Sequence, residues 1–355
     1  MFAKKTLVAA AALLAAAGAA QAQSSVKLYG YIEASVGSFE DFNFADGTTD
    51  RATRVESGNM MTSFFGLSGS EDLGGGLKAE FVLEAFLAGD TGASVSNLAG
   101  IANNSGFFGR GSWVGLSGDF GRVALGQYDN AFFTMGLTYN PFGSSMTFSP
   151  TMVSYYSLGG YLKPSLGYDT GWVNSVTYET PNFGGFTASL QFAPKETSAG
   201  GDAKNNYAVS AAYNAGALSV MGVYTSSGDI NSAYFDRQKN WGLGASYDFG
   251  VAKLSAQYSV IKRETGGGDG KAKFFQIGAE VPVTDAGKVM VSYGQTKYDD
   301  FYVIDGKLKQ ISLGYDHTLS KRSGVYAALT SKKLSDFGFA DESANTFAVG
   351  LRHAF

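Results

Sequence analysis

The sequence predicts an all-β protein, a closed antiparallel β-barrel that crosses a membrane, and three features of the chain indicate this fold class. First, large apolar residues alternate with small or polar ones, as in the segment NWGLGASYDF at positions 240–249. Second, such segments run for about ten residues, which is the length of a tilted strand that crosses a bilayer. Third, very short turns alternate along the chain with long polar loops, which is typical of transmembrane barrels.

Backbone hydrogen bonding explains why these features belong together. In hydrocarbon every N–H and C=O group must be paired, and strands achieve this only in a closed sheet. A secreted β-sandwich is the alternative. The length of the segments and the frequent Tyr and Phe near their ends favour the barrel, in which aromatic side chains form interfacial girdles. The apolar face then meets lipid, while the polar face, with its low wall of glycines and serines, lines a water-filled lumen.

The alternation defines about sixteen strands, an even number as expected for a bacterial barrel. In the C-terminal half, for example, Leu254, Tyr258 and Val260 alternate with small polar residues. The strands are expected near residues 25–37, 59–70, 77–88, 107–118, 121–128, 173–181, 185–194, 205–214, 217–226, 240–249, 251–262, 272–283, 287–297, 307–317, 323–332 and 345–355. Long polar loops are expected at residues 226–239, 263–271, 297–306 and 332–344.

The N-terminal residues 1–22 are typical of a cleaved signal peptide. Lys4 and Lys5 form the positive end, a short alanine-rich apolar run follows, and Ala20-Gln21-Ala22 is an A-x-A cleavage site. The run is too short for a transmembrane anchor. We therefore expect cleavage between Ala22 and Gln23, a single barrel domain over residues 23–355, and a mature net charge of −6, since the two lysines leave a chain of net charge −4.

Composition argues against several classes of function. The chain has no cysteine and only two histidines, so thiolate chemistry is excluded and a multi-histidine zinc site is disfavoured. The acidic balance disfavours nucleic acid as a partner. No G-x-S-x-G motif accompanies His317 or His353, and the glycine runs lack a P-loop lysine. We therefore expect no enzyme activity, catalytic residue, cofactor or metal site. One alternative concerns the acidic cluster of Asp299, Asp300 and Asp305. It is either part of a solvated loop or a site for a divalent cation that bridges to lipopolysaccharide.

One connection, residues 129–172, is far longer than the others and breaks the alternation. We call it the inserted segment. It is rich in aromatic residues, which argues against disorder. Loops of this length in compact folds usually have a function. An apolar loop in a hollow barrel can fold inward and pack against the wall.

Several stretches resemble the Gram-negative general porins, most closely the betaproteobacterial type. The segments concerned are SVKLYGYIEASVG near the mature N-terminus, GSEDLGGGLKAEF at 69–81, FFGRGSWVGLSGDFG at 107–121, NSVTYETPNFGGFTASLQF at 174–192 and the ending GLRHAF. The resemblance implies a sixteen-stranded, homotrimeric outer-membrane barrel that conducts ions and small hydrophilic solutes. It also implies that the long third loop folds inward as a constriction, and that Phe355 is the terminal aromatic recognised by the outer-membrane assembly machinery.

The sequence departs from the charge pattern of that family at the expected constriction. Phe64, Ser68 and Gln127 stand where basic residues are common, and the loop element Asn140-Pro141-Phe142-Gly143 lacks an acid. Arg110 matches the pattern. Because the wall has lost positive charges, we expect weak or cation-leaning selectivity in place of a strong preference for anions.

Strand parity and the resemblance together give the candidate pore-lining residues. Parity places Glu33, Arg54, Glu56, Lys78, Glu80 and Glu84 on the inner face, since unpaired charges facing lipid are costly. The resemblance places Arg110 in the lumen, Glu179 lies in a family-like stretch, and Asp129 and Asp169 are the acids of the inserted segment. For each of them, the alternative is a solvated wall residue without a selective role.

Three alternative functions remain open. A substrate-specific channel of the same fold would use the aromatic residues of the inserted segment as a contact track for a sugar or an organic or aromatic acid. A structural outer-membrane protein or adhesin would not conduct, and a secreted enzyme would be soluble without detergent. In the membrane, lipid and lipopolysaccharide are the expected surroundings.

Overall fold

The structure, a computed structural model, describes residues 25–43, 47–95, 106–156, 168–195, 204–228, 236–266, 268–300, 305–338 and 340–355. The predicted signal peptide, with its cleavage site between Ala22 and Gln23, lies outside these residues.

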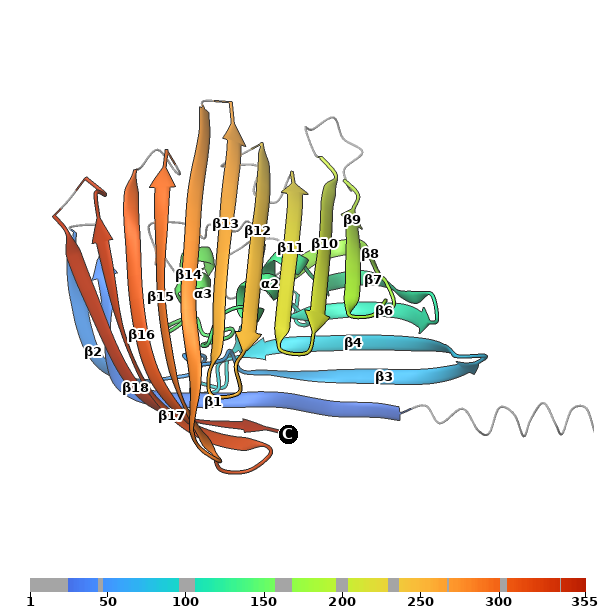
Figure 1. The fold of residues 1–355 in the computed structure, drawn as a ribbon, viewed down its shortest axis with the longest axis horizontal. Coiled ribbons are helices and arrows are strands. Elements are labelled where there is room, and N and C mark those ends of the chain that lie inside the picture. The colour runs from blue at the N-terminus through green and yellow to red at the C-terminus, as the bar shows by residue number, and fades with distance from the viewer. Residues whose placement is uncertain are drawn as a thin grey trace, which may run out of the picture.

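The described residues form a single antiparallel sheet of 18 strand segments that closes on itself (Figure 1). The first nine are β1 (Ser25–Asn43), β2 (Thr48–Glu56), β3 (Phe64–Gly74), β4 (Leu77–Leu87), β5 (Ser94–Val95), β6 (Gly111–Gly118), β7 (Gly121–Asp129), β8 (Gly171–Glu179) and β9 (Phe186–Ala193). The others are β10 (Asn206–Ala215), β11 (Leu218–Ser227), β12 (Arg237–Asp248), β13 (Lys253–Thr265), β14 (Gly268–Thr284), β15 (Gly287–Asp299), β16 (Gly306–Thr318), β17 (Ser323–Ser335) and β18 (Glu342–Ala354).

These segments make the sixteen-stranded barrel that the sequence predicts. Both β2 and β3 pair with β1. The pairs of β2 run from Ser35↔Glu56 toward the long loops, and those of β3 run from Tyr31↔Phe64 toward the short turns. The two segments are therefore halves of one strand that is interrupted between them. The two-residue β5 only extends the pairing of β4. Neighbours in sequence are otherwise neighbours in the sheet, and the prediction of an all-β barrel is confirmed.

The barrel closes where β18 pairs with β1, from Tyr31↔Ala354 to Ser38↔Phe347. The C-terminal residue continues this ladder, because Phe355 N donates to Gly30 O at 3.1 Å and Gly30 N donates to Phe355 O at 3.2 Å. Gly37 sits at the same seam, where an added Cβ would lie 2.2 Å from the carbonyl oxygen of Phe347. The two strands can approach each other only because this position has no side chain.

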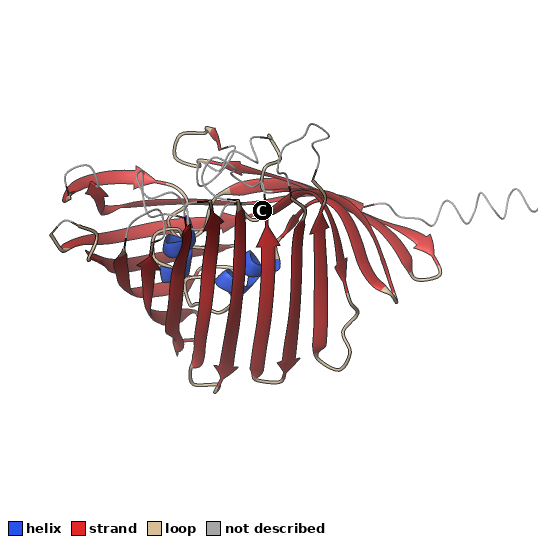
Figure 2. Cartoon of the chain, turned by 90° about the horizontal axis from the view of Figure 1, so that it is seen from above, coloured by secondary structure: helices blue, strands red, loops and turns tan. Residues whose placement is uncertain are grey.

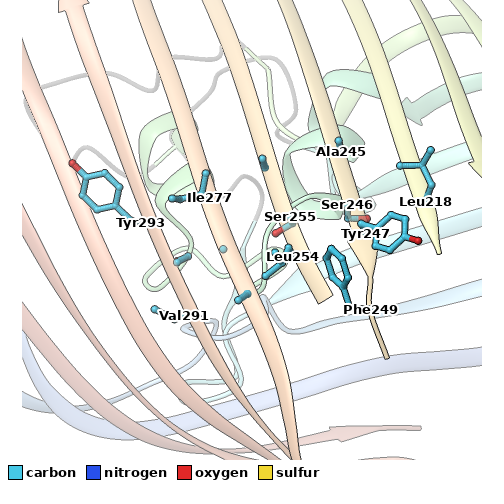
Figure 3. Close-up of a pocket in the computed structure, with 14 residues that line it drawn as sticks. Leu218, Ala245, Ser246, Tyr247, Phe249, Leu254, Ser255, Ile277, Val291 and Tyr293 are labelled. Atoms are coloured by element: carbon cyan, nitrogen blue, oxygen red, sulfur yellow. The ribbon is translucent and has the colours of Figure 1, made fainter. Parts of the chain in front are cut away.

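The two faces of the sheet differ as the alternation predicts. Outward residues such as Leu243, Ile277 and Leu351 are 55–58% exposed, whereas inward residues such as Ser259 and Gln276 are buried. On the outer face, small residues leave an apolar hollow of about 610 Å³ at the short-turn end of β11–β15 (Figure 3). An apolar outer face is stable in hydrocarbon, because it exposes no unpaired polar group to lipid.

Several strands are longer than predicted at the long-loop end. The first strand runs to Asn43, β2 is additional, and the expected loop 263–271 is largely a hairpin in which Thr265 pairs with Gly268. At this end the outward positions become charged, so the apolar alternation stops although the backbone ladder continues. The hydrophobic pattern therefore marks the width of the apolar band and not the length of the strands.

Two short helices, α2 (Ala131–Thr138) and α3 (Pro150–Tyr156), lie in the inserted segment, which carried no periodic pattern in the sequence. Figure 2 shows both helices within the curve of the sheet. Among the described residues, no helix has the length and apolar character needed to cross a membrane.

Candidate pore constriction

The first helix of the inserted segment starts from a polar anchor. Asn130 caps α2 by accepting a hydrogen bond at its Oδ1 from Phe132 N at 3.0 Å. The same oxygen accepts a bond from Tyr168 Oη at 3.1 Å, and Asn130 Nδ2 donates to Gln191 Oε1 at 2.9 Å. The start of the helix is therefore fixed both to the barrel wall and to the returning end of the segment.

Glycines on the inner wall let the inserted segment approach closely. An added Cβ at Gly244 would lie 2.2 Å from Tyr139, and one at Gly242 would lie 2.4 Å from Met135. The same relation holds for Gly278 with Pro141, Gly294 with Pro150 and Gly314 with Phe142. These glycines were expected to keep the wall low beside water. Gly242 and Gly244 are instead covered by protein, because a wall without side chains is what the segment needs for close packing.

Hydrogen bonds between hydroxyl and amide groups complete this contact. Tyr155 Oη lies 2.9 Å from Ser259 Oγ, and Ser154 Oγ lies 2.6 Å from Thr296 Oγ1. Gln276 Oε1 accepts a bond from Thr151 N at 3.0 Å. Aromatic side chains of the segment are among the most buried in the described part of the protein. Phe132, Phe148 and Tyr155, for example, each have 0% exposure. These described side chains pack against the wall and one another and therefore offer no contact track to a solute.

The opposite side of the lumen stays open. A cavity of about 720 Å³ is lined by β1, β4 and β6–β11, with Ala131 and Thr134 as contributions from α2. The charged residues that line it are Glu84, Arg110, Asp129 and Glu179, accompanied by Tyr29, Trp113 and Tyr128. The predicted lumen residues Glu84, Arg110, Asp129 and Glu179 thus come together at one cavity.

Arg110 is held by an anion and an aromatic ring. Its guanidinium pairs with Glu84 and lies 4.1 Å from the ring centroid of Phe64. Tyr29 Oη donates to Glu84 at 2.5 Å, while the backbone of Arg110 accepts a bond from Thr170 Oγ1 at 2.9 Å. Phe64, which stands where the family often has a cation, therefore supports the remaining arginine.

A second arginine, Arg122, joins two of the predicted carboxylates. Its Nε donates to Glu80 at 3.1 Å and its Nη1 donates to Glu179 at 3.1 Å, with Tyr128 Oη 3.4 Å away. Sequence reasoning missed Arg122. The signal was present, because Arg122 alternates with the apolar Val123 and so shares the polar face of its strand.

Glu33 is buried and is not among the residues that line the cavity. It has no exposed surface, and its carboxylate accepts bonds from the backbone of Gly58, from Asn59 N at 3.0 Å and from Tyr326 Oη at 2.5 Å. These bonds tie the interruption between β2 and β3 to β17, which gives Glu33 a structural task.

The other predicted residues lie apart from the cavity. Arg54 forms ion pairs with Asp41 at 2.7 Å and with Glu56 at 2.5 Å on the β1–β2 wall toward the long loops. Asp169 is 3% exposed, and its carbonyl oxygen accepts a bond from Tyr156 Oη. Lys78 is opposite Asp72 near a short turn.

The described residues hold no group of three or more His, Cys, Asp or Glu side chains that could bind a metal ion. In the acidic cluster considered above, Asp299 bonds to Lys273 at 2.9 Å and to Lys297 at 2.6 Å. Asp305 Oδ1 accepts a bond from the backbone N–H of Asp300 at 2.9 Å. The carboxylates of Asp299 and Asp305 are therefore engaged within the protein.

Comparison with known proteins extends these observations. Residues 9–336 match a family model described as Gram-negative porin. The chain is 39% identical to outer membrane porin protein 32 of Delftia acidovorans over 373 residues, with 99% of this chain and 100% of that protein covered. It is 30% identical to an outer membrane porin protein of Bordetella pertussis, again over 99% of this chain and 100% of the relative.

Solved structures agree with the fold. The anion-selective porin from Comamonas acidovorans superposes with a TM-score of 0.76 at 32% identity, over 94% of this chain and 100% of that one. The trimer form of OmpT from Vibrio cholerae superposes with a TM-score of 0.65 at 14% identity, over 94% and 99% of the two chains. The second likeness concerns the fold alone.

Proposed function

The chain belongs to the Gram-negative porin family and is an outer-membrane channel protein, and from this premise we propose that it is a passive diffusion pore of weak, cation-leaning selectivity. Ions and small hydrophilic solutes cross through the cavity beside the inserted segment, which narrows the lumen. The pore catalyses no reaction and needs no cofactor.

The balance of charge at the cavity carries this proposal. The cavity is lined by one arginine, Arg110, and by the carboxylates of Glu84, Asp129 and Glu179. Arg122 pairs with Glu179 and with Glu80, which lies outside the cavity lining. Each arginine is engaged by at least one of these carboxylates. The solved Comamonas porin is described as anion-selective. In this chain the arginines are paired and carboxylates are in excess, which supports a preference for cations, because a lumen lined by carboxylates attracts them.

The assembly and surroundings belong to the same proposal. The signal peptide 1–22 is removed, residues 23–355 form one barrel domain, and three copies associate as a homotrimer. Phe355 is presented to the assembly machinery before its backbone completes the seam with β1. The apolar outer face contacts lipid and lipopolysaccharide.

Recording from planar bilayers in a salt gradient tests the proposal. We expect stepwise currents, a conductance that rises linearly with salt, and a reversal potential that indicates potassium over chloride. Absence of steps would reject the pore, and a chloride preference would reject the assigned selectivity.

A substrate-specific channel is the second candidate, favoured by the side chains of Tyr29, Trp113 and Tyr128 at the cavity. Aromatic rings of this kind can contact a sugar or an aromatic acid. Saturable block of the single-channel current by such a solute would establish this function, and current that stays unblocked up to high solute concentration would reject it.

A further inference from the structure

The cavity beside the inserted segment combines aromatic rings with carboxylates on one wall. Trp113 of β6 and Tyr128 of β7 both line it, and their ring centroids are 5.2 Å apart. The carboxylates of Asp129 and Glu179 line the same cavity. We call these four residues the aromatic–acid wall. A permeating solute meets an apolar surface and a negative charge together on this wall.

An irregularity in the pairing of β7 with β8 gives the wall its shape. The register shifts between Gly126 and Tyr128, where β8 has one residue more than β7. Within this bulge Asn174 has a φ of 54°, in the left-handed region. Consecutive side chains of a regular strand point to opposite faces, but here Gln127, Tyr128 and Asp129 all line the cavity. The bulge therefore directs a ring and a neighbouring carboxylate to the same side.

Asp129 gives the wall a negative charge that no cationic side chain of the described residues contacts. Asp129 is exposed, and no Lys, Arg or His nitrogen of these residues lies within 4.0 Å of its carboxylate. By contrast, Glu84 is paired with Arg110 and Glu179 is paired with Arg122. A cation that enters the cavity can therefore approach Asp129 without displacing an arginine.

Aromatic rings in this part of the lumen already contact cations of the protein itself. The guanidinium of Arg122 lies 5.8 Å from the ring centroid of Trp113, and that of Arg110 lies 4.1 Å from the ring centroid of Phe64. A cation at such a distance is attracted by the quadrupole of the ring. Trp113 lines the cavity whereas Arg122 does not, so the surface of the indole that meets the cavity is open to a second cation.

Neutral polar side chains of the cavity are engaged within the protein. Gln127 Nε2 donates to Gly109 O at 2.6 Å, and Ser189 Oγ lies 2.7 Å from Ser210 Oγ. A sugar needs several free hydrogen-bonding groups for its hydroxyls. An alkylated ammonium ion needs only a negative charge and apolar or aromatic surface, because its positive charge is spread over carbon-bound substituents. The wall suits the second kind of solute.

We propose that the aromatic–acid wall binds organic cations with an alkylated ammonium group. The charged group lies beside Asp129, and its substituents lie on the rings of Trp113 and Tyr128. Potassium has the charge without the apolar surface, and a neutral solute has the surface without the charge, so both bind more weakly. A bound organic cation occupies the path of the potassium current and reduces it. The inference rests on the proposed cation-leaning pore and adds the class of solute that this pore binds.

Block of the potassium current through the purified full-length protein in planar bilayers tests the inference. The probe is choline, and its control is dimethylbutanol, an uncharged isostere with carbon in place of the nitrogen. We expect choline to reduce the single-channel current in a saturable way, and the alcohol at equal concentration to leave the current unchanged. Equal block by the two solutes, or no block by choline, would overturn the proposal.

A charge variant locates the ammonium group. Asp129→Asn keeps the shape of the side chain and removes its charge, so we expect the concentration of choline for half-block to rise about fivefold. The matched control Asp119→Asn removes the same charge at an exposed position in the short turn between β6 and β7. Block in the control should equal that of the wild type.

A ring variant locates the substituents. Trp113→Leu removes the aromatic surface, so the concentration for half-block should rise about two- to fivefold, whereas Trp113→Phe keeps a ring and should keep most of the block. The matched control Trp241→Leu removes an indole on the outer face, where its ring lies 5.5 Å from that of Tyr258. Should Trp113→Leu form no channel, Asp129→Asn and Trp113→Phe decide the outcome.

The same recordings separate failure of this inference from failure of the pore function. Potassium-selective steps without choline block would reject the inference and leave the function in place. Absence of steps, or a preference for chloride, would reject the function on which the inference rests. Block that is unchanged in both Asp129→Asn and Trp113→Leu, or equally reduced in their controls, would show that the solute does not bind at this wall.

Discussion

Neutralising Glu84 is expected to turn the pore toward anions. Glu84 is the carboxylate partner of Arg110 and accepts a second bond from Tyr29 at 2.5 Å. In Glu84→Gln the amide keeps the shape of the side chain and removes one negative charge. Arg110 stays in place because Phe64 supports its guanidinium at 4.1 Å and Thr170 binds its backbone. Its positive charge then acts on the lumen without the carboxylate that paired with it.

The size of the effect follows from the dimensions of the cavity. A cavity of about 720 Å³ is about 11 Å across if spherical, so a charge on its wall acts on an ion at the centre over about 6 Å. In water this interaction is about 0.7 kcal/mol, and screening at 0.1 M salt reduces it to about 0.4 kcal/mol. Chloride then gains about twofold and potassium loses about twofold in local concentration, which changes the permeability ratio about fourfold.

Reversal potentials in a potassium chloride gradient measure this ratio directly. The matched control is Glu71→Gln, which removes the same charge at an exposed position near a short turn. The effect should shrink at high salt, because screening weakens it. A permeability ratio in Glu84→Gln equal to that of the wild type would refute the reasoning, as would an equal shift in the control.

Two further predictions concern glycines. In Gly244→Ala the new Cβ would lie 2.2 Å from Tyr139. We therefore expect the inserted segment to shift at a cost of about 1–3 kcal/mol and the single-channel conductance to change. The control is Gly222→Ala, whose Cβ would have the flexible end of a leucine side chain as its nearest neighbour at 3.2 Å and should leave conductance as in the wild type. In Gly37→Ala the Cβ would lie 2.2 Å from a backbone oxygen of β18, so the barrel should unfold at a lower temperature in a heated-gel assay, and an unchanged transition would contradict this account of the seam.

The fold could be predicted from the sequence wherever strands cross hydrocarbon. There, each outward position must be apolar, and the resulting period of two gives the strands and their faces. The predicted strands end at the edge of the apolar band, so the prediction missed β2 and the part of β13 at the long-loop end. It also missed α2 and α3, which have 8 and 7 residues. Helices this short are stabilised by tertiary packing, which leaves little local signal.

The sequence predicted which charged residues face the lumen at the candidate site, but not which of them form ion pairs with one another. Parity placed Glu80 and Glu84 on the inner face, and the family resemblance supplied Arg110. Which charges neutralise one another depends on register between strands far apart in sequence, such as the approach of Glu80 and Glu179 to Arg122. No periodic pattern in a single chain contains that information.

The position of the inserted segment decides which charges a permeating ion meets. The segment covers the glycine-rich wall, as Gly242 and Gly278 show by their contacts with Met135 and Pro141. The open cavity is therefore left along β1, β4 and β6–β11, and Arg110 lies on this side, paired with Glu84. A substitution on the covered wall acts by moving the segment and changes the width of the pore, whereas one on the open wall acts by its charge. Conductance and ion preference should therefore respond to different sets of residues, because a single loop separates the two walls.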